Sequence, residues 1–218
     1  MSTRVEEGLV YVNAGRVTLE GNLLIPDGAR GVVMFAHGSG SSRFSARNRQ
    51  VAEVLRGGGV GTLLIDLLTR AEEDVDMRTA QLRFDIRLLA DRLVGASEWL
   101  AKQPETRALK LGLFGASTGG GAALVAAARV PERIAAIVSR GGRPDLAGPA
   151  LPAVQAPTLL IVGGDDAPVI EMNRAAYEQM VCERRMVIVP GASHLFEEPG
   201  KIEEVARLAA EWFTEHLA

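Results

Sequence analysis

Cysteine is nearly absent from this chain of 218 residues, which contains only Cys182. One cysteine excludes a disulfide within the chain and any metal site built from several thiolates, and we expect no bound metal. Long hydrophobic runs are absent too, since no apolar stretch approaches the length of about 18 residues that a membrane span needs. The first ten residues lack the basic and apolar regions of a signal peptide. These absences favour a cytoplasmic protein with no membrane partner.

An excess of positive charge is also lacking. The net charge is −3 and the basic residues are scattered along the chain, so we expect no nucleic-acid partner. The glycines between Gly112 and Gly121 match neither G-x-G-x-x-G nor a loop followed by Lys, which argues against nucleotide binding. What the chain has in quantity is apolar residues, 47% of the total, enough to bury a large core. We expect one domain over residues 1–218.

Apolar stretches alternate with helix-like stretches along most of the chain. Alternating residues at 9–13 and 16–25 predict an antiparallel hairpin. Continuous apolar runs predict buried strands at 31–36, 60–66, 109–114, 134–139, 157–162 and 185–189. Helices are expected at 45–56, 77–102, after residue 117, at 169–181 and at 201–217, with loops at 67–76 and 140–156. This order predicts an α/β fold, with a mostly parallel sheet of about eight strands, the hairpin at its N-terminal end and helices on both faces.

The clearest chemical signal lies between Leu109 and Val130. A short apolar run leads into Gly115-Ala116-Ser117-Thr118-Gly119 and then into an Ala-rich segment, which predicts strand, sharp turn and helix. A Ser at the centre of G-x-S-x-G is held on a strained turn at a helix N-terminus, where its hydroxyl is exposed. We interpret Ser117 as a nucleophile. A closely packed corner with no chemistry is the alternative, so the motif needs a base, an acid and an oxyanion site elsewhere.

The chain has three histidines from which the general base must come. His216 lies near the end of the last predicted helix, where we expect it to be solvated. His37 directly follows a buried strand, and there a His usually holds the loop by a hydrogen bond. His194 lies in a loop after the last predicted strand, from which its ring can reach the turn. We therefore interpret His194 as the base.

Two neighbouring aspartates compete for the role of the acid. Asp165 and Asp166 follow the strand predicted at 157–162, and only one of the two side chains can point into a site. Ser117, an acid near residue 165 and then His194 follow the chain order expected for a triad on this kind of sheet. All of them come after the carboxyl ends of strands, where ligands of such sheets bind.

Backbone N–H groups would complete the site by binding the oxyanion. Thr118, the residue after the nucleophile, supplies one donor, and a second comes from the loop that follows the strand at 31–36, where we select Ser39. Gly38 and Gly40 let that loop approach closely. His37 belongs to the same loop.

With these residues in place, the chain resembles the α/β-hydrolase superfamily, and within it the dienelactone hydrolase-like group. The resemblance covers essentially the whole length and is carried by four segments, FAHGSGSS, GASTGG, IVGGDDAPV and PGASHLFEEPG. It implies that Asp166, three residues before Val169, is the acid of the triad. Dienelactone hydrolases themselves use Cys at the turn, where this chain has Ser117, so the resemblance favours a serine esterase over a dienelactone substrate. Proteins of this fold often form homodimers, and the sequence identifies no surface for one.

The expected activity is that of a cofactor-free serine hydrolase acting on small or short-acyl carboxylic esters. No insertion between Ser139 and Pro157 is long enough for a cap domain, so we expect a small, open site. Thioesters, lactones and small amides are alternative substrates, and a binding or regulatory protein without turnover is the alternative outside enzymes. Arg43 and Arg140 would clamp a substrate carboxylate if they faced the site. We favour the interpretation that these arginines form surface ion pairs with acidic neighbours such as Asp145.

Overall fold

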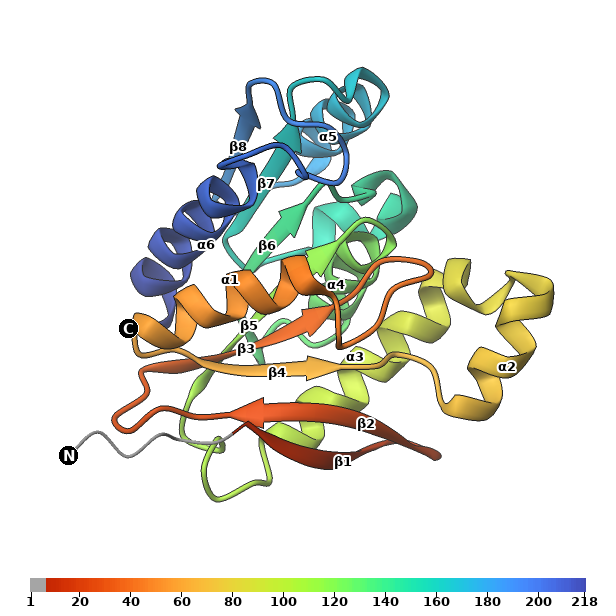
Figure 1. The fold of residues 1–218 in the computed structure, drawn as a ribbon, viewed down its shortest axis with the longest axis vertical. Helices are drawn as coiled ribbons and strands as arrows, with labels where there is room; N and C mark the ends of the chain where they lie inside the picture. Colours follow the sequence, from red (N-terminus) through yellow and green to blue (C-terminus); the bar gives the residue numbers. More distant parts are fainter. Residues whose placement is uncertain (1–6) are drawn as a thin grey trace.

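A computed structural model describes residues 7–218, which build one eight-stranded sheet with helices on both faces (Figure 1). The strands are β1 (Gly8–Ala14), β2 (Val17–Leu24), β3 (Gly31–Ala36), β4 (Gly61–Ile65), β5 (Lys110–Ala116), β6 (Ile134–Arg140), β7 (Thr158–Gly163) and β8 (Arg184–Val189). The helices are α1 (Ala46–Gly57), α2 (Arg70–Thr79), η1 (Leu82–Phe84), α3 (Ile86–Leu100), α4 (Thr118–Arg129), η2 (Pro144–Ala153), α5 (Ala167–Gln179) and α6 (Lys201–Leu217).

The strands lie in the order β1-β2-β4-β3-β5-β6-β7-β8. β1 pairs antiparallel with β2, and β2 pairs antiparallel with β4, whereas all pairs from β4 to β8 are parallel. The predicted α/β fold with its N-terminal hairpin is thus confirmed. Parallel strands place their carboxyl ends at one edge of the sheet, so the loops after β3, β5, β7 and β8 meet there.

The two faces of the sheet carry separate cores. Helices α1 and α6 cover one face, where Phe35 of β3 and Phe114 of β5 lie with ring centroids 4.9 Å apart. Helices α3 and α4 cover the other face, with Leu93 and Leu124 fully buried. The continuous apolar runs of β3 and β5 follow from this arrangement, since both faces of each strand are covered.

Helix α2 is the main departure from the sequence prediction. The loop expected at 67–76 and the single helix expected at 77–102 are both wrong, because the chain forms α2, the short turn η1 and then α3. Thr69 caps α2 in a capping box with Glu72, and Asp85 caps α3 by accepting from the N–H of Leu88. These caps fix two helix starts that hydrophobic spacing does not reveal. α2 stands outside the sheet layers (Figure 1).

The other boundaries agree with the prediction within a few residues. The segment expected as a loop at 140–156 contains the 3₁₀ helix η2, which lies against α4 and α5. No helix in residues 7–218 has the length and apolarity that crossing a bilayer requires.

Candidate active site

Ser117 occupies a strained turn between β5 and α4. Its backbone has φ of 50° and ψ of −122°, a conformation that L-residues with a side chain rarely adopt. Two backbone hydrogen bonds stabilise the turn. The N–H of Ser117 donates to the carbonyl oxygen of Arg140 at 3.3 Å, and the carbonyl oxygen of Ser117 accepts from the N–H of Arg143 at 3.1 Å. The end of β6 and the segment directly after it therefore hold Ser117 in position.

Glycines allow the backbone to approach itself on every side of this turn. A Cβ atom on Gly115 would lie 2.5 Å from the Cα of Gly120, and one on Gly119 would lie 2.2 Å from the carbonyl oxygen of Ala36. Neither contact leaves room for a side chain. The G-x-S-x-G spacing is thus required by packing at this corner, and it brings β3 and its following loop against the start of α4.

His194 and Asp166 are hydrogen-bonded to each other. Asp166 lies just after β7 and His194 in the loop after β8, and Nδ1 of His194 is 2.7 Å from Oδ2 of Asp166. The Asp166 side chain is 14% exposed and that of His194 is 38% exposed. Asp165 is exposed, so Asp166 is the member of the pair that contacts the imidazole. This contact directs the Nε2 atom of His194 away from Asp166.

The loop that carries His194 is stabilised from within. The carboxylate of Glu198 accepts a hydrogen bond from the N–H of Ser193 at 3.1 Å, and this bond holds the pKa of Glu198 below its usual value. Phe196 is buried and adopts a left-handed conformation with φ of 57°. A Cβ atom on Gly141 would lie 3.7 Å from Cε1 of His194, so the imidazole stands beside the end of β6, which also holds Ser117.

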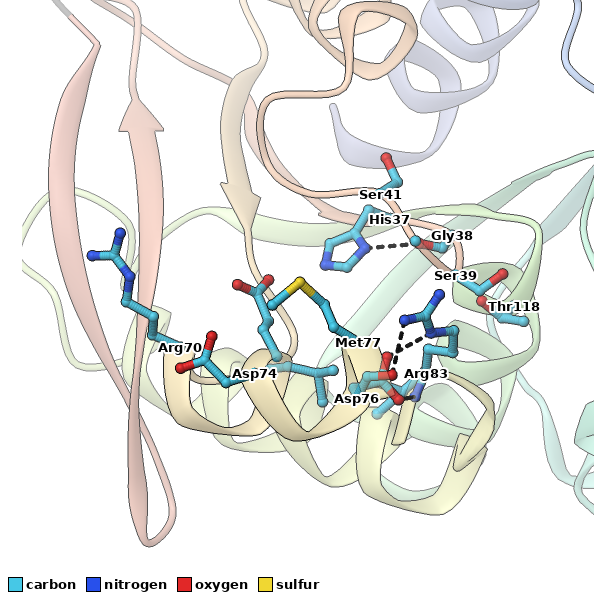
Figure 2. Close-up of a pocket in the computed structure, with 14 residues that line it drawn as sticks. His37, Gly38, Ser39, Ser41, Arg70, Asp74, Asp76, Met77, Arg83 and Thr118 are labelled. Carbon is cyan, nitrogen blue, oxygen red and sulfur yellow. Dashed lines mark hydrogen bonds and ion pairs between the residues drawn. The ribbon is translucent and has the colours of Figure 1, made fainter. Parts of the chain in front are cut away.

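A cavity of about 300 Å³ opens beside Thr118 (Figure 2). Thr118 lies next to Ser117 in the chain, but Ser117, Asp166 and His194 are not among the residues that line the cavity. Ser39 and Thr118, the two predicted oxyanion residues, both line it. Thr118 is the first residue of α4, and its N–H has no acceptor within the helix. Gly38 packs against the turn, because a Cβ atom there would lie 3.1 Å from Cβ of Ser117. The remaining lining residues are His37, Gly40, Ser41, Leu68, Arg70, Glu73, Asp74, Asp76, Met77, Arg83 and Leu89.

His37 holds the loop that contains Ser39. Its Nδ1 lies 2.9 Å from the carbonyl oxygen of Gly38, and its Nε2 lies 3.2 Å from the backbone nitrogen of Leu67. The carbonyl can only accept and the N–H can only donate, so the neutral tautomer protonated at Nδ1 satisfies both contacts. Burial lowers the pKa of His37, more than the Gly38 carbonyl and Asp66 raise it. This geometry agrees with the loop-holding role expected from the sequence.

Arg43 is occupied by structural contacts. Its guanidinium pairs with Asp66 and lies 2.7 Å from Glu20, and its Nε donates to Asn22 at 2.9 Å. Arg140 is buried on the α1 side of β6. Within residues 7–218 the arginines that line the cavity are Arg70 and Arg83. The geometry therefore does not favour a carboxylate clamp made by Arg43 and Arg140.

Sequence reasoning missed the wall that α2 and η1 contribute to the cavity. Asp76 is buried and accepts from the N–H groups of Leu82 and Arg83 and from the guanidinium of Arg83. Burial acts to raise the pKa of Asp76, but the hydrogen bonds from Arg83 and Leu82 outweigh it and leave the pKa below its usual value. Figure 2 shows the Arg83 guanidinium directed toward Ser39 and Thr118. The sequence feature that could have revealed this wall is the capping box of α2, formed by Thr69 and Glu72.

His216 is not solvated, contrary to the sequence expectation. Its ring packs on Trp212 with centroids 4.4 Å apart, and its Nε2 is 3.7 Å from Glu183. His216, Glu183 and Glu215 each offer one candidate metal-ligand atom, and these three atoms lie within 4.8 Å of one another. None of these residues lines the cavity beside Ser117.

The sheet order and the strained Ser117 turn define an α/β-hydrolase fold, and residues 7–218 contain no inserted cap domain. The chain belongs to the dienelactone hydrolase family, whose model matches residues 19–217. A dienelactone hydrolase from Anabaena variabilis ATCC 29413 is 65% identical, with a TM-score of 0.96 over 98% of this chain and 99% of that one. Est1E from Butyrivibrio proteoclasticus shares the fold, with 17% identity and a TM-score of 0.79 over 95% of this chain and 98% of that one.

One relative is considerably longer than this chain. A Mycobacterium tuberculosis (strain H37Rv) protein, provisionally named a phosphoribosyl transferase, is 57% identical over 208 residues. The match covers 95% of this chain and 46% of that protein. The chain thus spans about half the length of the curated relatives it matches. The chain is thus a member of a hydrolase family and has the fold of that family.

Proposed function

We propose that this chain is a serine hydrolase that cleaves small or short-acyl carboxylic esters through Ser117, His194 and Asp166. The observation that carries the proposal is the 2.7 Å contact between Asp166 and His194 beside the strained Ser117 turn. Gly would adopt the positive φ of residue 117 without strain, but Gly has no hydroxyl. The strain has a physical reason if the hydroxyl must be exposed for chemistry.

In this mechanism Ser117 Oγ attacks the ester carbonyl carbon while Nε2 of His194 takes the hydroxyl proton. Asp166 accepts the Nδ1–H of His194 and stabilises the imidazolium that forms. The backbone N–H groups of Thr118 and Ser39 bind the oxyanion. The tetrahedral intermediate collapses, the alcohol leaves with the proton from His194, and an acyl-enzyme remains. Water attacks the acyl-enzyme in the same way, which releases the acid and restores Ser117.

The cavity favours small substrates. A volume of about 300 Å³ is at the low end of the range for ligand sites. Charged side chains of α2 and η1 form one wall, including Glu73 and Arg83, and a long alkyl chain would bury them. Burial raises the pKa of Glu73, and repulsion from Asp66 contributes a smaller increase. Thioesters, lactones and small amides fit the same chemistry and are alternative substrates.

The transferase name of the Mycobacterium tuberculosis relative describes a protein about twice as long. The matched half corresponds to the hydrolase fold described above. Of the glycines from Gly112 to Gly121, the first two lie in β5 and the last three begin α4, and no Lys directly follows them. We therefore propose hydrolysis, and not phosphoribosyl transfer, for the segment that this chain shares with the relative.

The test compares wild type with Ser117→Ala on p-nitrophenyl acetate, butyrate and octanoate, with fluorophosphonate labelling alongside. We expect turnover that falls with acyl length, and loss of both turnover and labelling in Ser117→Ala. Ser42→Ala is the control, because Ser42 lies outside the cavity. Folded wild-type protein that neither hydrolyses these esters nor reacts with fluorophosphonate would contradict the proposal and favour a binding protein.

A further inference from the structure

Arg140 is a buried cation to which the part of the chain that the structure describes offers no carboxylate partner. It is the last residue of β6, and the residue is only 5% exposed. No carboxylate in residues 7–218 lies within salt-bridge distance of its guanidinium, and its Nε has no hydrogen-bond partner there. Burial, and to a smaller extent the neighbouring Arg47, lowers the pKa of Arg140 to about 10. At neutral pH the guanidinium is still charged.

Two neighbours contact the guanidinium. Nη2 of Arg140 lies 3.4 Å from Oδ1 of Asn48 in α1, and the guanidinium carbon lies 5.8 Å from the centroid of the Phe196 ring. Asn48 and Phe196 are themselves buried. A cation over an aromatic face is attracted to it, and more strongly where water is excluded. Glu197, the carboxylate next to Phe196, pairs instead with Arg47.

Phe196 connects this cation to His194. The two residues are in the same loop, and the N–H of Phe196 donates to the carbonyl oxygen of Ser193 at 3.2 Å, which closes a turn around His194. A Cβ atom on Gly141 would lie 3.4 Å from the Phe196 ring and 3.1 Å from the carbonyl oxygen of His194. The loop thus rests on the chain segment that directly follows Arg140.

Arg140 also contacts the Ser117 side of the site, through its backbone. The carbonyl oxygen of Arg140 accepts the N–H of Ser117, at 3.3 Å. The side chain of Arg140 contacts the loop that carries His194, while its backbone contacts Ser117. Arg140 therefore lies where it can set the position of the His194 loop relative to Ser117.

A buried charge without a partner costs stability, and an apolar side chain of similar size is often neutral or stabilising at such a site. If residue 140 served packing alone, Met would fill the same space. We propose that Arg140 is a positioning residue that holds Phe196, and through it the loop at 190–200, so that His194 is aligned with Ser117. The proposal rests on the catalytic role of His194 proposed above.

The test uses Arg140→Met, Arg140→Lys and the matched control Arg133→Met. Arg133 directly precedes β6 and forms a partly exposed ion pair with Glu132. For Arg140→Met we expect kcat on p-nitrophenyl acetate to fall by about 10- to 100-fold, because small misplacements of reacting groups have effects of this order. KM should change less than about 3-fold, and the melting temperature should be equal to or above that of wild type. Arg140→Lys should recover part of kcat, and Arg133→Met should keep the kcat of wild type.

A double-mutant cycle with Phe196→Leu tests the pathway of the effect. If Arg140 acts through Phe196, the double variant should lose little more kcat than the worse single variant. Fully additive losses would overturn the proposal. So would a fall in melting temperature that accompanies the loss of kcat in Arg140→Met, because a purely structural role predicts it.

A readout independent of turnover separates this proposal from the proposed function. Amide hydrogen exchange at 190–200 should become faster in Arg140→Met, with the rest of the sheet unchanged. If wild type has no esterase activity but this exchange increases locally, the proposed function fails and the contact between Arg140 and the loop remains. Unchanged exchange in an otherwise active series would overturn the positioning role alone.

Discussion

Asp165 and Asp166 offer a controlled test of the candidate triad, because two adjacent carboxylates differ in one respect. Asp166 contacts Nδ1 of His194 at 2.7 Å, whereas Asp165 is exposed. In Asp166→Asn the amide presents either an oxygen or an NH₂ group to Nδ1. Its NH₂ group would favour the tautomer with the proton on Nε2, and this tautomer cannot take the proton of Ser117.

The expected loss in kcat/KM for Asp166→Asn is about 10⁴-fold, by analogy with the same substitution in serine proteases, which corresponds to about 5.4 kcal/mol of transition-state stabilisation. Folding should be unaffected. Asp166 is the N-cap residue of α5 but makes no capping hydrogen bond with its side chain, and Asn is as good as Asp at such positions. Initial rates on p-nitrophenyl acetate and thermal melts by circular dichroism measure the two effects. Asp165→Asn should keep activity within about 2-fold. Equal losses in the two variants, or an active Asp166→Asn, would refute the assignment of Asp166.

Two further predictions concern the scaffold around the site. Gly119→Ala should lower the free energy of unfolding by about 3 kcal/mol or more, because its Cβ would meet the carbonyl oxygen of Ala36 at 2.2 Å. Thermal melts should show that the melting temperature of Gly119→Ala falls by roughly 6 to 12 °C. A Cβ atom on Gly57 would meet open space, so the control Gly57→Ala should be neutral or stabilising. Because burial lowers the pKa of His37 below 6.5, the unfolded chain binds the proton more readily. Stability should therefore fall as pH decreases below about 6.5. Urea titrations from pH 5 to 7 should show a shallower dependence of stability on pH in His37→Gln, and an unchanged dependence would contradict a neutral, partly buried His37.

The strand pattern and the turn at Ser117 could be predicted from the sequence because both depend on local rules. Continuous apolar runs such as Gly31–Ala36 are required wherever a parallel strand is covered on both faces. The glycines of the turn have equally local causes. Helix α2 could not be predicted from apolar spacing, because among its described residues only Asp76 is buried. It is stabilised by caps and by ion pairs, including the one between Glu72 and Arg92.

The arginines show why site residues on strand ends are harder to predict than the turn itself. Arg140 is the last residue of β6 and Arg43 lies in the loop after β3, and nothing in their sequence positions distinguishes a substrate contact from a structural one. The structure separates them by charge environment: Arg43 has two carboxylate partners, Asp66 and Glu20, and Arg140 has none among the described residues. A paired guanidinium is explained by the fold that it stabilises. An unpaired one in the interior opposes folding, so its presence between Ser117 and the His194 loop is better explained by the alignment of the site than by stability.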